Sequence, residues 1–318
     1  MRRRAALALA LAFSSPGIGF GQKVSKETKL AVPMKANWFG LSRNGHVAVA
    51  ICEDHQFRVW SLPDRRLLHT IDIGPGEVGI SVLSDDGATA VVTDYEGGVR
   101  VVDTARGEVR MQKVWPYPVS AAFSPDGKLL ALAPANEPVQ IIDIGSWRKR
   151  YELQRTTGGN AALAFSSDGT RIAAGDSDTV VRVFDARNGE LLSRYTDFLL
   201  VPLGVDFTPD GKRVAAGGGD KVVAFVDAAT GNSPYKTERQ ADAVYHLKFS
   251  PDGLHLAVGL INTASMSKPA PVLVYESSGR KVLDWNPPTV AIGGGWTADG
   301  RLLIGTSTED AVVIWRVW

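Results

Sequence analysis

Short runs of apolar residues alternate with polar turns along almost the whole chain. In one representative stretch, residues 161–165 are apolar, 166–169 form a polar segment rich in Ser and Asp, and 170–174 are mostly apolar again. Two further runs follow, Val181–Asp185 and the more polar Leu191–Tyr195. Runs of this length, rich in β-branched, aromatic and small apolar residues and bounded by Ser, Asp and Gly, are typical of β-strands joined by tight turns. The pattern therefore predicts a unit of four short antiparallel strands.

This unit recurs seven times, and each copy carries a turn that ends in glycine. Successive turn glycines are separated by 42, 40, 42, 42, 42 and 47 residues, and they are Gly45, Gly87, Gly127, Gly169, Gly211, Gly253 and Gly300. A period of about 40 to 45 residues with four strands per repeat is the signature of a β-propeller blade. We predict one all-β domain over residues 22–318, a seven-bladed β-propeller of four-stranded antiparallel blades.

The two ends of the repeat region fit a closed ring. The last copy stops at Trp318, directly after its third strand, which would leave that strand as an open edge. Open strand edges favour aggregation. Residues 27–32, Glu-Thr-Lys-Leu-Ala-Val, precede the first copy and have the length and pattern of the missing strand. We expect this N-terminal strand to close the ring as the outermost strand of the last blade.

The first 21 residues have the pattern of a secretory signal peptide. Three arginines are followed by a short Ala- and Leu-rich run and by small residues up to Gly21. The apolar run is short of the roughly 20 residues that span a bilayer, so cleavage is favoured over a retained anchor. We expect a periplasmic or secreted protein exported by the general secretory route, with twin-arginine export as the less favoured alternative.

The charge of the chain argues against two classes of partner, and its single cysteine predicts a buried thiol. Without residues 1–21, the chain has 32 basic and 34 acidic residues, so bulk charge predicts no binding to nucleic acid or to an anionic membrane. The single cysteine, Cys52, cannot form an internal disulfide and lies in an apolar run, so we expect a buried thiol.

The repeat resembles the WD40 family. The resemblance rests on the order of strand, Ser-Pro-Asp-Gly turn, strand, acidic turn, and a third strand that ends in an apolar or aromatic residue followed by Asp, as in Val181–Asp185. The family's Trp-Asp pair is absent, since Trp60 is followed by Ser61 and Trp315 by Arg316, and its Gly-His pair is missing too. The family's Asp-His-Ser-Trp side-chain network therefore does not carry over. The divergence is similar to that of WD40-like and YVTN-type bacterial propellers.

The sequence lacks the catalytic motifs that we sought. It has no nucleophile elbow, phosphate-binding loop, zinc-protease motif or haem-attachment motif. Its five histidines are scattered over different repeats, whereas a metal site needs several that converge. We expect no metal, no cofactor and no catalytic residue. His246 is the one candidate for a functional channel residue, because it lies on a predicted innermost strand.

One irregular interval points to a candidate binding face. The 47-residue spacing contains an insertion at residues 261–271, which lengthens the link between the second and third strands of the sixth unit. In WD40 propellers, that link and the links entering each first strand share one face. Aromatic residues mixed with Arg are typical of binding hot spots. The candidate partner-binding residues on this face are Trp115, Tyr117, Arg155, Phe198, Arg239, Asp242, Met266, Lys268 and Trp285.

Two alternatives stay open for this face. Trp115, Phe198 and Trp285 could pack between blades, and the insertion could be a neutral surface loop. The sequence favours a monomeric, non-catalytic scaffold that binds an unidentified protein or peptide. The alternatives are a propeller enzyme, either a lactonase-like hydrolase or a subunit of the quinoprotein dehydrogenase type, and a binder of small ligands in the central channel.

Overall fold

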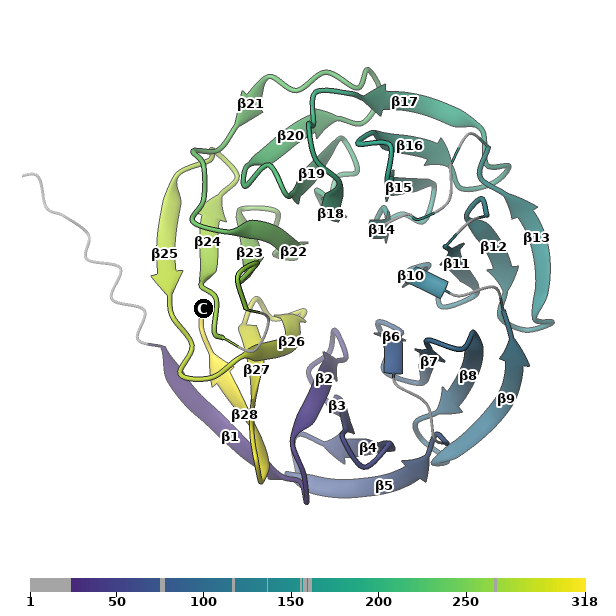
Figure 1. Cartoon of the computed structure of the whole chain (residues 1–318), viewed down its shortest axis with the longest axis vertical. Helices are drawn as coiled ribbons and strands as arrows, with labels where there is room; N and C mark the ends of the chain where they lie inside the picture. Colours follow the sequence, from purple (N-terminus) through teal and green to yellow (C-terminus); the bar gives the residue numbers. More distant parts are fainter. Residues whose placement is uncertain are drawn as a thin grey trace, which may run out of the picture.

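The described residues form a ring of seven blades, each of them a four-stranded antiparallel sheet (Figure 1). The computed structural model describes residues 24–74, 78–115, 118–135, 137–154, 156, 159, 162–265 and 268–318. The strands of a blade follow one another outward from the centre of the ring (Figure 1). The predicted fold class, a seven-bladed propeller, is confirmed. Nowhere in the described ranges is there a helix long and apolar enough to cross a membrane.

Each blade supplies one strand to each of four concentric layers, and we number the blades 1 to 7 by the order of their innermost strands. The innermost strands are β2 (Ala36–Leu41), β6 (Val78–Leu83), β10 (Pro118–Phe123), β14 (Ala162–Phe165), β18 (Pro202–Phe207), β22 (Ala243–Phe249) and β26 (Ala291–Trp296). The second strands are β3 (Val47–Cys52), β7 (Thr89–Asp94), β11 (Leu129–Pro134), β15 (Arg171–Gly175), β19 (Arg213–Gly218), β23 (His255–Ile261) and β27 (Leu302–Thr308).

The third and outermost layers complete the blades. The third strands are β4 (Gln56–Ser61), β8 (Gly98–Asp103), β12 (Gln140–Asp143), β16 (Val181–Asp185), β20 (Val223–Asp227), β24 (Val272–Glu276) and β28 (Ala311–Arg316). The outermost strands of blades 1 to 6 are β5 (Arg66–Asp72), β9 (Glu108–Val114), β13 (Arg148–Glu152), β17 (Leu191–Tyr195), β21 (Tyr235–Lys236) and β25 (Lys281–Trp285), and that of blade 7 is β1 (Ser25–Ala31).

The N-terminal strand closes the ring. β1 pairs antiparallel with β28 and brings Leu30 opposite Val312. Leu30 and Val32 are only 2% and 6% exposed, and they pack in the core between blades 7 and 1. The expected closing strand at about residues 27–32 is therefore confirmed, and the observed strand begins and ends slightly earlier, at Ser25–Ala31.

The hydrophobic core lies between neighbouring blades. Each cluster combines side chains from the facing surfaces of two blades, as with Val101 of blade 2 and Leu132 of blade 3. Strands buried on both faces need apolar residues at consecutive positions, which explains the continuous apolar runs of the second and third strands. Cys52 lies in such a run as a buried free thiol, as predicted.

The repeated glycine turns are held by their own side chains. In blade 3, the Ser124 hydroxyl donates to Asp126 Oδ1 at 2.7 Å and accepts the backbone N–H of Leu129 at 2.9 Å. Gly127 takes φ = 67°, a left-handed conformation that residues with a side chain rarely adopt. The corresponding bond to the third turn residue recurs in the other six copies. This shared turn chemistry fixes the inner hairpin of every blade.

Buried arginine–aspartate pairs recur in three blades. The three arginines occupy the second position of the apolar run that recurs in the third strands, and they are 6%, 8% and 9% exposed; they are Arg58, Arg100 and Arg182. Each pairs with a carboxylate from the end of the second strand or from the turn that follows it, in the pairs Asp54–Arg58, Asp94–Arg100 and Asp178–Arg182. The Asp176-Ser177-Asp178 segment therefore serves turn and ion-pair chemistry. Asp176 lies 3.4 Å from Arg182 as well.

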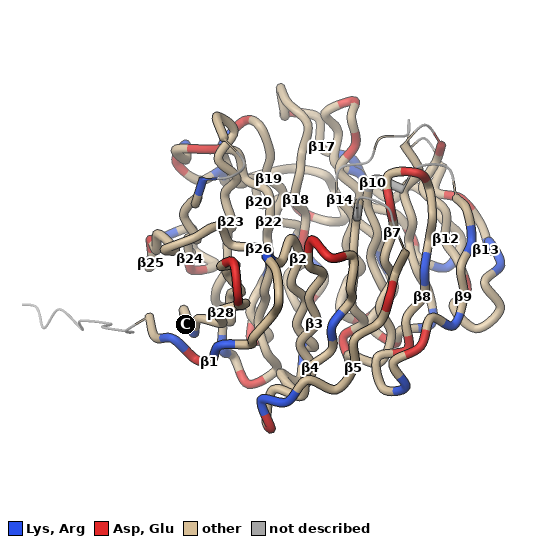
Figure 2. The backbone as a smooth tube through the Cα atoms, turned by 60° about the horizontal axis from the view of Figure 1, so that its bottom comes forward, with Lys and Arg blue, Asp and Glu red and all other residues tan. Residues whose placement is uncertain are grey.

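Basic and acidic positions are interspersed over the links and strands in the view of Figure 2. No side of the molecule in that view carries one sign of charge alone. The observation agrees with a chain whose basic and acidic residues nearly balance.

Candidate functional site

The links that enter the innermost strands share one face with the turns between second and third strands. Three hydrogen bonds join these two kinds of segment: Leu199 N–H to Asp220 Oδ2 at 2.8 Å, Lys221 Nζ to the Ala241 carbonyl at 2.8 Å, and Thr263 Oγ1 to Asp242 Oδ1 at 2.7 Å. We call this the upper face. The opposite, lower face carries the glycine turns. The arrangement expected from the resemblance is thus present at blades 5 and 6.

Three of the predicted binding residues, Tyr117, Arg155 and Met266, lie outside the described residues. Of the others, Arg239 and Lys268 are exposed and Asp242 is half-buried on the upper face. Asp242 accepts hydrogen bonds from Thr263 and lies 3.7 Å from Lys221. Its contacts tie the inserted loop to the neighbouring link.

Trp115 and Trp285 are held between blades. Trp115 is half-buried, its Nε1 donates to Gln140 Oε1 at 3.0 Å, and Lys113 Nζ lies 5.0 Å from its ring centre. It packs on the core between blades 2 and 3. The ring of Trp285 lies 5.8 Å from that of Trp315 in the core between blades 6 and 7. For both tryptophans the geometry favours the packing alternative.

Phe198 is a core residue, so its expected exposure on the upper face was wrong. It is 3% exposed and makes an edge-to-face contact with Tyr195 at 5.4 Å between ring centres. An aromatic ring in a link gains more free energy by filling the gap between blades 4 and 5 than by contact with water.

We predict that Phe198→Ala lowers the free energy of unfolding by about 3–5 kcal/mol, because it removes a buried aromatic ring and leaves a cavity. Urea unfolding followed by circular dichroism measures the change. A loss below about 0.5 kcal/mol, which is usual for surface positions, would contradict the buried placement.

Two leucines next to Phe198 form an exposed apolar pair that is not among the candidate binding residues from the sequence. Leu199 is 85% and Leu200 is 52% exposed. Their loop is nevertheless ordered, because Phe198 anchors it in the core, the Leu199 N–H donates to Asp220, and the Gly219 N–H donates to the Val201 carbonyl at 3.3 Å. The available signal was a pair of leucines within a link, where polar residues are usual.

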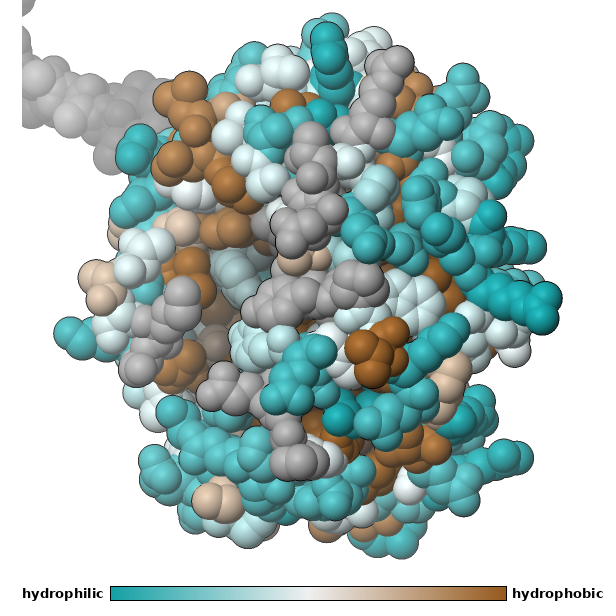
Figure 3. All heavy atoms as spheres, turned by 45° about the vertical axis from the view of Figure 1, so that its right-hand side comes forward, coloured by the Kyte–Doolittle hydropathy of each residue, from teal (hydrophilic) through white to brown (hydrophobic). Residues whose placement is uncertain are grey.

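The innermost strand of blade 6 presents polar side chains to the central channel. A β-bulge between Val244 and His246 places both Tyr245 and His246 on the exposed side, and their rings lie 4.8 Å apart. The His246 side chain is exposed on this strand, although protein surrounds its ring on several sides. These surroundings, together with the charge of Lys248, lower the pKa of His246, so its imidazole is neutral at pH 7. In Figure 3, hydrophobic atoms border a hollow on the left of the view.

The channel contains an ion pair below His246. Lys248 Nζ lies 3.1 Å from Asp206 Oδ1, and Asp206 Oδ2 accepts the N–H of Phe249 at 2.7 Å. Across the described residues, no group of three or more His, Cys, Asp or Glu side chains is arranged to hold a metal ion. His246 is not accompanied there by the two carboxylates that an enzyme of the expected kind would need.

Comparisons with known proteins agree with the fold. Residues 121–197 match the family model of the anaphase-promoting complex subunit 4 WD40 domain. The chain is similar to a chain in a solved structure described as "Crystal Structure of Mitotic Checkpoint Complex", with a TM-score of 0.78, 20% sequence identity and coverage of 100% of both chains. No curated protein sequence matches the chain. At this identity the structural likeness shows the fold alone, and in fold the chain is a WD40-like seven-bladed β-propeller.

Proposed function

We propose that the chain is a non-catalytic scaffold that binds a partner protein through the upper face of its propeller. The observation that carries this proposal is the Leu199–Leu200 pair, which the ordered loop between β17 and β18 holds in water. Exposed leucines on an anchored loop are unfavourable in the free protein, and their burial by a partner stabilises the complex. The WD40-like fold and the protein complex named for its structural relative support the same function.

The partner is expected to offer an apolar pocket to the two leucines. Burial of a leucine side chain contributes about 1.5–3 kcal/mol, so replacement of both residues by Asp should weaken the complex by about 100-fold or more. Arg239 and Lys268, which are exposed on the same face, would lie at the rim of this interface. The proposed interface does not include the other exposed loops of the upper face.

A photo-crosslinking residue at position 199 identifies the partner, and affinity measurements with the purified partner then test the site. We expect the variant Leu199→Asp/Leu200→Asp to lose binding and Leu254→Asp to retain it. Leu254 is a matched control, since it is 57% exposed in a glycine turn of the lower face. Equal affinity of the double variant and the unaltered chain would refute the upper-face site.

We further propose that residues 1–21 direct export and are then removed, and that the chain works as a monomer of the bacterial YVTN-like group. The basic start, the short apolar run and the small residues up to Gly21 support export. The mass of the protein recovered from the cell envelope tests the cleavage.

A further inference from the structure

The innermost strands carry one equivalent position that is small or apolar in five blades and charged in two. This position lies two residues before the Ser or Thr of each glycine turn. In chain order its residues are Gly40, Val82, Ala122, Ala164, Asp206, Lys248 and Gly295. The two charged residues stand in neighbouring blades and pair with each other. The repeat alone therefore does not require charges here.

The two partners of this pair differ in their access to water. The Asp206 side chain is 7% exposed, whereas that of Lys248 is 60% exposed. Both Asp206 oxygens already have donors, Lys248 Nζ and the Phe249 N–H. An ammonium group has three donors, and only one of them is used by Asp206. The Asp206 carboxylate is therefore buried, whereas the Lys248 ammonium group exposes hydrogen-bond donors to the channel.

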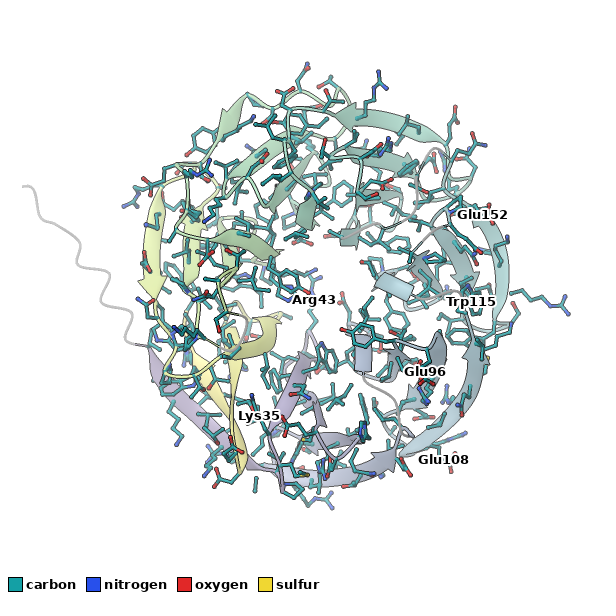
Figure 4. The ribbon with its side chains drawn as sticks, viewed as in Figure 1. Lys35, Arg43, Glu96, Glu108, Trp115 and Glu152 are labelled. Atoms are coloured by element: carbon teal, nitrogen blue, oxygen red, sulfur yellow. The ribbon has the colours of Figure 1, made fainter. Side chains whose placement is uncertain are left out.

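Nearby charges keep this ammonium group positive. The negative charge of Asp206 is the main cause that raises the pKa of Lys248. Burial raises the pKa of Asp206, and the charge of Lys248 and the Phe249 N–H offset that rise only in part. The ion pair itself rests on geometry, since Lys248 Nζ lies 3.1 Å from Asp206 Oδ1 and the other Asp206 oxygen accepts the Phe249 N–H. Arg43 points toward the middle of the ring in Figure 4 and forms a 3.3 Å ion pair with Asp85 at the lower end of the channel. This second pair is balanced, with side chains 41% and 46% exposed.

Apolar and aromatic groups lie above the ammonium group. Tyr245 is 44% exposed at the bulge of β22, three residues before Lys248. The bulge position of the neighbouring blade 5 holds Leu203, which is half-buried. Strands rise about 3.3 Å per residue, so Tyr245 and Lys248 are separated by about 10 Å along the channel. That length suits a ligand about the size of one or two amino-acid residues.

We propose that the central channel binds a ligand that joins an apolar body to a carboxylate, with the carboxylate at Lys248 and the body against Tyr245 and Leu203. A free carboxylic acid and the C-terminus of a peptide share this chemistry. The exposed cation with its buried counter-ion favours an anionic group over a cationic one. This site is separate from the Leu199–Leu200 surface and does not depend on the proposed scaffold function.

N-acetyl-leucine is a probe that carries both features, and N-acetyl-leucinamide is its matched neutral control. We expect ligand-observed NMR titration to show binding of the acid and at least tenfold weaker binding of the amide, because a hydrogen bond to a charged group is lost. Lys248→Met should weaken binding of the acid by a similar factor. Lys128→Met, an exposed lysine on the lower face, should leave it unchanged.

Lys248→Met leaves Asp206 without its counter-ion, so it could fail to fold. The variant Asp206→Asn/Lys248→Met removes both charges and keeps an acceptor for the Phe249 N–H, and thermal unfolding checks that it folds. Equal binding of the acid and the amide would overturn the proposal, and so would undiminished binding of the acid by this folded double variant. The proposal would also fail if the acid did not bind at about 10 mM, a concentration at which weak fragments bind. A purely structural role for the pair predicts one of these results.

A second titration separates the two sources of the carboxylate. The peptide Ala-Ala-Ala-Leu is compared with N-acetyl-leucine, each against its own amide. Tighter binding of the peptide acid supports a protein C-terminus as the ligand, and tighter binding of the single residue supports a small molecule. The variant Leu199→Asp/Leu200→Asp should bind N-acetyl-leucine normally, so failure of the scaffold proposal and failure of the channel site are distinguishable.

Discussion

Deletion of residues 24–32 is expected to destroy the cooperative folding of the whole ring. It removes β1, exposes the edge of β28, and takes Leu30 and Val32 out of the core between blades 7 and 1. Burial of the two side chains alone contributes about 1.5–3 kcal/mol each, and lost strand pairing adds to this. Domains typically have only about 5–15 kcal/mol of stability, so we expect a loss of at least about 5 kcal/mol. Thermal unfolding followed by circular dichroism measures the effect.

Two point variants distinguish closure of the ring from a general effect of truncation. Leu30→Asp places a charge at a position that is 2% exposed and should cost several kcal/mol, about the penalty for an unpaired buried polar group. Lys29→Ala removes the neighbouring exposed ion pair to Asp310 and should change stability by less than about 1 kcal/mol. If the truncated chain unfolded at the temperature of the intact chain, the closing role of β1 would be refuted.

The repeat made the fold predictable because every copy carries the same local chemistry. The hydroxyl of Ser124 and the carboxylate of Asp126 close a turn within a few residues, so the information is local in the sequence. The closing strand was predictable for a different reason, because a four-stranded blade with three strands at the end of the chain needs a fourth. Neither inference required knowledge of long-range packing.

The exposed residues of the upper face were harder to predict because the direction of a side chain in a link depends on its neighbours in space. Phe198, Leu199 and Leu200 are consecutive and apolar, and nothing in their order shows which of them points inward. Phe198 points inward because its ring contacts Tyr195 and because the Leu199 N–H donates to Asp220. Phe198 therefore lies in the core, and the two leucines that follow it are exposed.

The channel pair illustrates a signal that was present in the sequence and was not used. Asp206 and Lys248 stand at equivalent positions of the repeat, two residues before Thr208 and Ser250. Comparison of the seven copies at that position would have separated them from the small residues of the other blades. Their contact across two blades, however, follows only from the ring geometry.

Asp94→Ala is expected to lower the free energy of unfolding by about 3–5 kcal/mol, because it leaves the buried Arg100 without a counter-ion. Arg100 Nη1 lies 2.7 Å from Asp94 Oδ2, and the two residues are 8% and 6% exposed. Asp94 Oδ1 also accepts the N–H groups of Glu96 and Gly98. Urea unfolding gives the change. Asp284→Ala is the control, since it breaks the exposed pair with Lys281 and should cost less than about 1 kcal/mol.

Removal of both charges should recover much of this loss. Blades 5, 6 and 7 hold Ala224, Leu273 and Val313 at the position of Arg100, so the fold accepts an apolar side chain there. Asp94→Asn/Arg100→Leu keeps an acceptor for the turn N–H groups and removes the unpaired cation. If this double variant were as unstable as Asp94→Ala, an unpaired buried charge would not be the cause.

The unaltered chain should be more stable than the Asp94→Asn variant at neutral pH, and this difference should shrink at low pH. Burial of Asp94 raises its pKa, but the hydrogen bonds from Arg100 and the Gly98 N–H outweigh that effect, so its pKa in the folded chain is below its usual value. A depressed pKa contributes stability above the unfolded value of about 3.9, and this contribution is lost as the pH falls through the folded value. The advantage over Asp94→Asn should therefore be constant from pH 7 to about pH 5 and shrink below about pH 4. A constant difference down to pH 2 would show that folding does not lower the pKa of Asp94.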